Sequence, residues 1–496
     1  MQYQNPILLG DYSDPDVIRV GEDFYMISSS FTYLPGIPVL RSRDLVHWTL
    51  IGYAAARLPF ARYNTPQHRC GTWAPSLRWR DGLFYVYVCL SDEGLICLTA
   101  SDPAGEWQTH WVKDVTGWID PCPLFADDGR VWLVHGFAAS RAGINNLLYV
   151  HELSRDGLKV LDKGTLVYNG ADHGDTTVEG PKFYQRGGEY WILCPAGGVA
   201  TGYQLALRAG SPLGPYERRV MLAQGGTEVN GPHQGALFDD GHGREWFIHF
   251  QDVGIYGRVP HLQPVRWADG WPVAGRDGEP VSGGDTGLAP APGGVRMSDD
   301  FADGLGLQWQ WQANPDPAWY RPLKPGLRLY AAKADNPYHA GAFLSQMMQA
   351  WDFLWECRIT RYPASGDICG VGVMGFPYHC LVLEGETLRL VRGDIREIDR
   401  FTRERVTETV LAEASWPDRT AVFWMRVRGG RVTFGCRRPD EAPGTGVTVG
   451  ETVPMACGGW TSARPGLFCL NLTSGIGGYT DVAWVHVSDK GTDRLL

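Results

Sequence analysis

The stretch that decides the fold is Thr177-Val178-Glu179-Gly180-Pro181-Lys182-Phe183, in which a glutamate stands directly before a short strand. The turn Gln185-Arg186-Gly187-Gly188 follows, and then comes the aromatic-rich run Glu189-Tyr190-Trp191-Ile192-Leu193. Such a run has the composition of a buried strand. The stretch therefore defines a unit made of a leading residue, a strand, a tight turn and an aromatic strand.

This unit occurs five times in the first half of the chain. In each copy an aromatic residue follows the leading residue by 11 to 14 positions, and these aromatics are spaced 47 to 60 residues apart. Repeats of that length are typical of the blades of a β-propeller, each built from a few short strands. We therefore predict an all-β chain that begins with a five-bladed β-propeller. The leading residues are Asp14, Trp73, Asp120, Glu179 and His233.

The leading residues are predicted to converge on one site. The innermost strand of every blade lines the central channel of a propeller, so side chains at one register of these strands meet at one place. Three carboxylates, an indole and an imidazole would then surround a single hollow, although they are far apart in the sequence.

The composition indicates two domains. Residues 1–275 hold the five units, and the predicted linker at 276–297 is rich in Gly and Pro, with the run Ala289-Pro290-Ala291-Pro292. Residues 298–496 show short alternating runs, for example Trp355-Glu356-Cys357-Arg358-Ile359-Thr360. We predict an accessory β-sandwich or jelly roll there. Its role in structural support or in carbohydrate contact is left open by the aromatics Trp309, Trp311 and Trp319.

The net charge and the N-terminal sequence indicate which partners and which cellular compartment to expect. A formal net charge of -10 argues against a nucleic-acid or anionic-membrane partner and suits a neutral substrate. The N-terminal residues show no basic region followed by an apolar core, and no apolar run is long enough to span a bilayer. The 11 Cys lack CxxC spacing, which favours reduced thiols over disulfides or a zinc site. We expect a cytoplasmic protein.

Three acids around one channel suit the hydrolysis of a glycosidic bond with inversion. That reaction needs a carboxylic acid to protonate the leaving oxygen and a carboxylate to activate water on the opposite face, roughly 6.5 to 9.5 Å away. A third carboxylate near the acid raises the pKa of that acid by like-charge repulsion. The three acids are therefore predicted to serve as acid, base and pKa modulator.

Each candidate also has a plain structural interpretation. Asp-Pro is a common turn initiator, as at Asp14 and Asp120, and Glu179 before Gly-Pro suits a solvated loop. Their shared position in the repeated unit favours the functional interpretation. For His233, holding a channel water or cation and binding substrate are equal alternatives. Arg258, close after the fifth unit, is a candidate for binding substrate hydroxyls or for pairing with an acid.

Four short blocks stand out in the first domain. They are Ser13-Asp14-Pro15-Asp16, Gly71-Thr72-Trp73-Ala74-Pro75, Ile119-Asp120-Pro121 and Val178-Glu179-Gly180-Pro181. As a set they resemble the signature blocks of glycoside hydrolase family 43, the inverting β-xylosidases and α-L-arabinofuranosidases. The segment 29–48 is similar to the xylosidase-like branch of that family. The resemblance covers the whole first domain.

The resemblance implies a role for each acid. Asp14 matches the general base, Asp120 the pKa modulator and orienter, and Glu179 the general acid. Two departures, Tyr12-Ser13 and Gly231-Pro232-His233-Gln234-Gly235, leave the sugar preference open.

Further positions follow from the same resemblance. Phe31, Trp73 and Arg258 resemble positions that line the terminal-sugar subsite. His233 resembles a histidine that contacts a calcium ion or an ordered water in the channel. The run 305–311 looks like the opening of the concanavalin-like C-terminal domain of that branch, which in relatives can lend a loop to close the pocket.

We therefore expect an exo-acting, inverting β-xylosidase that takes a small oligosaccharide and requires no cofactor. An α-L-arabinofuranosidase or a bifunctional enzyme is the close alternative. A retaining fructan hydrolase or sugar phosphorylase on a five-bladed propeller is a second, and a carbohydrate-binding propeller without catalysis is a third. A structural Ca²⁺ in the channel and a homo-oligomeric state are both left open by the sequence.

Overall fold

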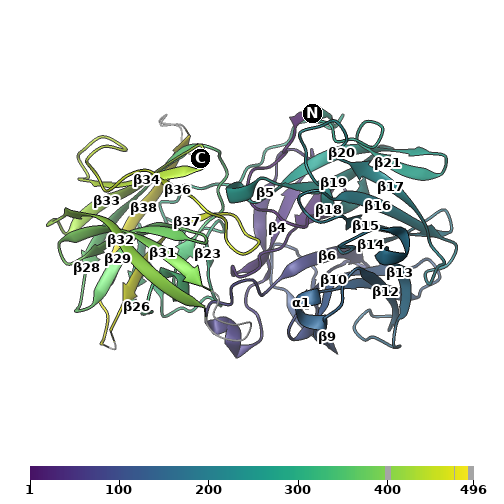
Figure 1. Cartoon of the computed structure of the whole chain (residues 1–496), viewed down its shortest axis with the longest axis horizontal. Helices are drawn as coiled ribbons and strands as arrows, with labels where there is room; N and C mark the ends of the chain where they lie inside the picture. The colour runs from purple at the N-terminus through teal and green to yellow at the C-terminus, as the bar shows by residue number, and fades with distance from the viewer. Residues whose placement is uncertain (397–403, 474, 490–496) are drawn as a thin grey trace.

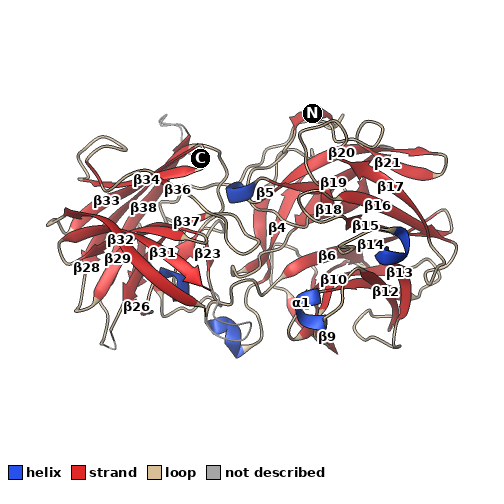
Figure 2. Ribbon diagram, in the orientation of Figure 1, coloured by secondary structure: helices blue, strands red, loops and turns tan. Residues whose placement is uncertain are grey.

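The computed structural model describes residues 1–396, 404–473 and 475–489. The chain forms two β-rich domains side by side, one from its purple-to-teal half and one from its green-to-yellow half (Figure 1). Strands dominate both domains, and the helices are single turns such as α1 (Ala139–Ala142) (Figure 2). Within the described ranges, no helix is long and apolar enough to cross a lipid bilayer.

The first domain is the predicted five-bladed β-propeller. In the described residues each blade is a four-stranded antiparallel sheet whose strands follow one another in sequence order. The innermost strands β2, β6, β10 and β14 are neighbours in turn. The innermost strand of the fifth blade, β18, contacts β15 and β16 of the fourth blade and lies beside β2, which closes the ring. The blades are β2 (Asp16–Val20), β3 (Asp23–Ile27), β4 (Gly36–Ser42) and β5 (Thr49–Ala55); β6 (Trp73–Arg80), β7 (Leu83–Leu90), β8 (Gly94–Ala100) and β9 (Gln108–Asp114); β10 (Trp118–Phe125), β11 (Val131–Phe137), β12 (Leu147–Leu153) and β13 (Thr165–Asn169); β14 (Lys182–Arg186), β15 (Glu189–Ala196), β16 (Tyr203–Ala209) and β17 (Glu217–Ala223); and β18 (His233–Asp239), β19 (Glu245–Asp252), β20 (Arg258–Ala268) and β21 (Trp271–Ala274).

The aromatics of the repeated unit pack between neighbouring blades. Trp132 lies in an apolar cluster between the third and fourth blades, and Trp191 and Phe247 share one between the fourth and fifth. Tyr25 and Tyr85 pack against the equivalent clusters on either side of the second blade. Each blade buries both of its faces in this way, which explains why the aromatic strand recurs in every copy.

Segments that precede and follow the five blades in the sequence pair with each other and pack against the ring. The strand β1 (Gln2–Gln4) pairs antiparallel with β22 (Gly283–Asp285), which lies inside the predicted linker at 276–297. Asn5 extends this contact, because its side chain donates to the carbonyls of Leu262 and Val281 and accepts from the Leu262 amide, at 2.8 to 2.9 Å. The N-terminus is therefore held against the fifth blade.

The second domain is a sandwich of two eight-stranded sheets within the described residues. Its core lies between the sheets and includes Trp309 and Trp311, which are 2% and 1% exposed, while Trp319 packs against them. These three aromatics are therefore structural. The strands of the sandwich are β23 (Gln310–Trp311), β24 (Tyr320–Pro322), β25 (Leu327–Tyr330), β26 (Ala332–Lys333), β27 (Leu344–Ser345), β28 (Phe353–Tyr362), β29 (Asp367–Met374), β30 (Tyr378–Glu384), β31 (Thr387–Arg396), β32 (Arg405–Ser415), β33 (Thr420–Arg428), β34 (Arg431–Arg437), β35 (Val447–Thr448), β36 (Val453–Pro454), β37 (Arg464–Asn471) and β38 (Tyr479–Asp489).

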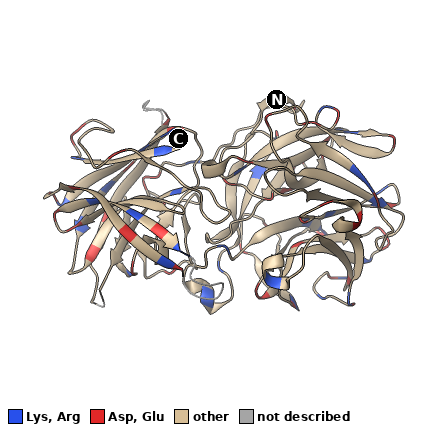
Figure 3. Ribbon diagram, in the orientation of Figure 1, with Lys and Arg blue, Asp and Glu red and all other residues tan. Residues whose placement is uncertain are grey.

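Acidic and basic residues are interspersed on the strands of both domains (Figure 3).

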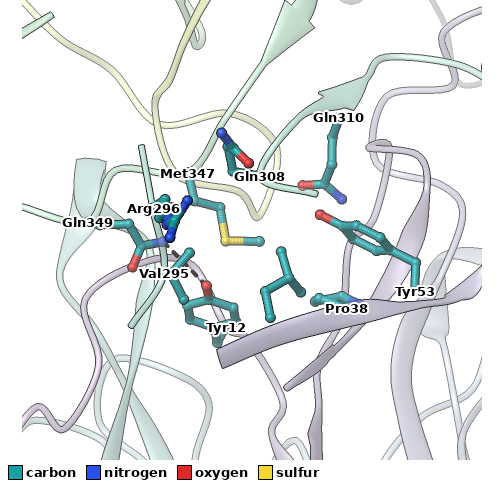
Figure 4. Close-up of a pocket in the computed structure, with 10 residues that line it drawn as sticks. Tyr12, Pro38, Tyr53, Val295, Arg296, Gln308, Gln310, Met347 and Gln349 are labelled. Carbon is teal, nitrogen blue, oxygen red and sulfur yellow. Dashed lines mark hydrogen bonds between the residues drawn. The ribbon is translucent and has the colours of Figure 1, made fainter. Parts of the chain in front are cut away.

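The two domains pack directly against each other. Leu34 of the propeller and Trp311 of the sandwich exchange two backbone hydrogen bonds, of 2.9 and 2.6 Å. A small pocket between the domains is lined by Tyr12 and Tyr53 on one side and by Gln310 and Gln349 on the other (Figure 4). It has about 10 Å³ of free space, roughly the room for one water molecule. The interface is therefore closely packed.

We expect Asn5→Ala to destabilise the protein by about 1–3 kcal/mol, because it leaves buried backbone groups of the fifth blade without partners. Denaturant unfolding of the full chain measures this loss. The control is Gln2→Ala, which removes an exposed hydrogen bond to Asp285 and should change stability by less than about 0.5 kcal/mol. Equal stability of the two variants would contradict the sealing role of Asn5.

Candidate active site

The three acids meet at the channel. Asp14 lies two residues before β2, Asp120 lies within β10, and Glu179 lies three residues before β14, so each lies on or just before the innermost strand of a different blade. The charge of Asp14 raises the pKa of Asp120, and both raise the pKa of Glu179, which places the three carboxyl groups within electrostatic reach of one another. The predicted convergence of these acids is what the structure shows.

A residue with a positive φ angle in each blade directs the side chains at this end of the inner strand. The residues Asp14, Ala74, Asp120, Gly180 and Gln234 have positive φ angles of 56°, 39°, 56°, 54° and 38°, one in each blade. In the second, third and fifth blades the strand pairing is interrupted at the same place. Such bulges redirect side chains next to active sites, and the strain of a positive φ is tolerated where the surrounding structure enforces it.

The position of the positive φ angle shows that the register predicted from the sequence is partly wrong. Asp14 and Asp120 are themselves the residues with positive φ, whereas Trp73, Glu179 and His233 stand one position before it. The prediction that all five leading residues share one register was therefore wrong by one residue for two of them. An alignment by residue type could not detect this shift, because the bulge adds a residue without changing the composition of the unit.

Asp14 is held by a serine that sequence analysis did not single out. The Ser29 hydroxyl donates to Asp14 Oδ2 at 2.5 Å and accepts from the Ala74 amide at 2.7 Å. Arg258 Nη1 lies 3.7 Å from Asp14 Oδ1. Burial raises the pKa of Asp14, while Arg258, the Ser29 hydrogen bond and Lys182 oppose that rise. These three groups favour the carboxylate form that a general base requires.

Asp120 connects the base to the acid. Its Oδ2 accepts the Gly180 amide at 2.7 Å, so it fixes the backbone directly after Glu179. A Cβ on Gly180 would lie 2.5 Å from the Gln234 side chain, and this close approach between blades requires glycine. Burial and the charge of Asp14 raise the pKa of Asp120 to about 7. The hydrogen bond to the Gly180 amide is compatible with the orienting role predicted for Asp120.

Glu179 is the most accessible of the three acids. Its side chain is 29% exposed, whereas that of Asp14 is 6% exposed. Burial, Asp120 and Asp14 raise the pKa of Glu179 to about 8, and Arg258 opposes them. A carboxyl group with that pKa is protonated at neutral pH, as a proton donor must be.

His233 lies beside Glu179 with unused hydrogen-bonding capacity. Its Nε2 is 3.5 Å from Glu179 Oε1, the residue is 1% exposed, and neither ring nitrogen has a hydrogen-bond partner. Burial lowers the pKa of His233 to about 3, so the ring is neutral. Among the described residues no group of three His, Cys, Asp or Glu side chains is arranged to hold a metal ion. The cation role of His233 therefore stays a prediction, and a water or a substrate hydroxyl fits the free nitrogens equally well.

Aromatic side chains form a wall beside the acids. Phe31 and Trp73, which are 5% and 8% exposed, pack with Ile119 and Ala138 in one apolar cluster. The Arg258 guanidinium lies 5.9 Å from the centre of the Phe31 ring. The structure therefore brings Phe31, Trp73 and Arg258 to the same site as the three acids, and such apolar faces suit the stacking of a sugar ring.

The sandwich domain adds Trp460 to this wall. Trp460 lies between β36 and β37, is 42% exposed, and has its ring centre 4.9 Å from that of Trp73 and 6.1 Å from that of Phe31. Its loop is anchored on the propeller, since the Ser462 amide donates to Asp11 Oδ2 at 2.8 Å. No sequence motif marks Trp460, and only the packing of the two domains reveals it.

Comparison with protein families agrees with this arrangement. The family model described as "Glycosyl hydrolases family 43" matches residues 3–272. The model described as "Beta xylosidase C-terminal Concanavalin A-like domain" matches residues 298–488. These two ranges correspond to the propeller and to the sandwich.

Individual relatives extend the similarity to both domains. The chain is 45% identical to a "Putative beta-xylosidase" from Xylanibacter ruminicola, over 75% of this chain and 72% of the relative. It is 35% identical to a "Non-reducing end alpha-L-arabinofuranosidase" from Bacteroides ovatus, over 73% and 71%. A solved structure of a family 43 enzyme, engineered to display both endo-xylanase and exo-arabinofuranosidase activity, superposes with a TM-score of 0.87 at 26% identity and covers 99% of this chain and 100% of that one. The chain therefore belongs to glycosyl hydrolases family 43 and is a glycosidase.

Proposed function

We propose that this glycosidase is an exo-acting, inverting β-xylosidase that releases terminal β-D-xylose from xylo-oligosaccharides. The observation that carries the proposal is the meeting of Asp14 and Glu179 beside an aromatic wall, with neighbours that act on them differently. Burial and two neighbouring acids raise the pKa of Glu179 to about 8, whereas at Asp14 the rise in pKa caused by burial is opposed by Arg258, the Ser29 hydrogen bond and Lys182. The 45% identical relative that carries the name beta-xylosidase supports the choice of sugar.

The proposal gives one role to each acid. Glu179 transfers its proton to the glycosidic oxygen as the bond from that oxygen to the anomeric carbon breaks. Asp14 takes a proton from a water molecule whose oxygen attacks the anomeric carbon from the opposite face, so the product has the inverted configuration. Asp120 holds the Gly180 amide and, by its proximity, keeps the pKa of Glu179 high.

The surroundings of the acids favour attack at a chain end. Trp73, Phe31 and Trp460 contact one another across the domain boundary, and we infer that this aromatic wall confines the space beside the carboxyl groups. A terminal sugar fits such a confined site, whereas an internal sugar needs an open groove on both sides.

An α-L-arabinofuranosidase is the second candidate, supported by the 35% identical relative that carries that name. Comparison of kcat/KM on 4-nitrophenyl β-D-xyloside and 4-nitrophenyl α-L-arabinofuranoside separates the two activities. We expect the higher value on the xyloside. A clear preference for the arabinofuranoside would overturn the proposed substrate, and comparable values would indicate a bifunctional enzyme.

Replacement of Glu179 tests the acid role. We expect Glu179→Gln to lower kcat/KM on xylobiose by about 100- to 10,000-fold, because a poor leaving group needs protonation, and to lower it much less on a dinitrophenyl xyloside, which needs none. Steady-state kinetics on both substrates measure the difference. The same change at Glu189, which is 45% exposed on β15, is the control and should leave both rates unchanged. Equal loss on both substrates would contradict proton donation by Glu179.

Replacement of Trp460 tests the contribution of the sandwich domain. We expect Trp460→Ala to lower kcat/KM on xylobiose by about 2- to 10-fold through loss of aromatic contact with the substrate and with Trp73. The control is Trp79→Ala, because Trp79 has a similar exposure of 46% on the outer part of β6. Unchanged kinetics in Trp460→Ala would exclude this residue from the substrate site.

A further inference from the structure

A second layer of charged side chains lies along the same inner strands as the acids. Asp16 Oδ2 accepts the Leu77 amide at 2.9 Å and Arg78 Nη1 at 3.1 Å, and it lies 3.3 Å from Lys182 Nζ. Asp16 is fully buried and Lys182 is 1% exposed. Charges removed from water in this way are maintained only when their partners are fixed, so this layer is a rigid part of the channel.

The layer connects four blades close to the reacting groups. Asp16 is two residues after Asp14 on β2, and Lys182 is three residues after Glu179 on β14. On β10, Cys122 Sγ is two residues after Asp120 and accepts from Arg78 Nη2 at 2.7 Å. Every proposed catalytic acid is therefore within three residues of a member of this layer.

Lys182 also reaches the segment that holds Asp14. Its Nζ donates to the Pro75 carbonyl at 3.0 Å and to Ser76 Oγ at 2.8 Å. Pro75 follows Ala74, whose amide donates to the Ser29 hydroxyl that holds Asp14. A continuous chain of contacts thus links the Lys182 ammonium to the proposed base through the bulge of the second blade.

We propose that Lys182 is a positioning residue of the glycosidase reaction, whose buried ammonium fixes the Pro75–Ser76 segment behind Asp14 and supplies positive charge to the channel. Lys182 and Arg78 carry two positive charges against the single negative charge of Asp16, which leaves one positive charge in the layer. The inference rests on the proposed roles of Asp14 and Glu179.

The electrostatics of the channel agree with this role. Lys182 is among the groups that lower the pKa of Asp14 and of Asp120. The other charged groups that act on Asp14 are Arg258, which also favours its carboxylate form, and Asp11, which opposes it. Asp120 and Glu179 face it from the third and fourth blades. Arg258 lowers the pKa of all three acids, whereas Lys182 lowers that of Asp14 and Asp120 and is not among the groups that act on Glu179.

The test is the pH dependence of kcat/KM on whichever nitrophenyl glycoside the wild-type protein hydrolyses faster. The acidic limb reports ionisation of the base. Lys182→Gln removes a positive charge and should move this limb to higher pH by about one unit. Asp16→Asn removes a negative charge and should move it to lower pH, while Lys182→Arg retains the charge and should leave it near its wild-type position.

A purely structural role would lower activity in these variants without opposite shifts of the acidic limb. Thermal unfolding of each variant establishes which of them are folded. If Lys182→Gln does not fold, the shift of the acidic limb in Asp16→Asn tests the proposal. An unmoved limb in the folded variants would overturn the proposal for Lys182. A wild-type protein that hydrolyses neither glycoside would instead contradict the proposed substrates.

Discussion

Three carboxyl groups that share one buried hollow impose the main physical constraint on this protein. Burial and mutual repulsion disfavour the ionised form of each, so all three cannot be charged at once at neutral pH. Only a rigid scaffold holds such groups together, and the propeller supplies it by closing five blades into a ring. The pairing of β1 with β22 and the contacts of Asn5 complete that ring at the fifth blade.

The environment then gives chemically identical groups different protonation states. Burial raises the pKa of Asp14, and Arg258, the Ser29 hydroxyl and the charge of Lys182 oppose that rise. Burial and the repulsion of Asp120 and Asp14 raise the pKa of Glu179 to about 8, and Arg258 opposes them. Asp120 accepts a hydrogen bond from the Gly180 amide and so fixes the backbone directly after Glu179. The proposed acid and the proposed base can thus coexist in one channel because their neighbours differ.

The sandwich domain takes part in the site as well as in the fold. Asp11 accepts the Ser462 amide with one oxygen and the Arg258 amide with the other, at 2.8 and 3.1 Å. The loop that carries Trp460 and the strand that carries Arg258 are therefore anchored on the same side chain. Elsewhere in the domain interface the Gln349 side chain donates to the Tyr12 hydroxyl (Figure 4).

The amino-acid sequence by itself determined the number of blades, the two-domain order and the meeting of Asp14, Asp120 and Glu179 at one site, because turn chemistry and aromatic spacing repeat locally and can be counted. It misplaced Asp14 and Asp120 by one register position, since a bulge depends on strand pairing and leaves composition unchanged. The sequence did not identify three residues near the acids, because each depends on contacts with other blades or the other domain: Ser29, Lys182 and Trp460. Only the tertiary structure decides such contacts, because hydrogen bonds, buried charges and ring packing between distant segments exist only once the ring has closed and the domains have docked.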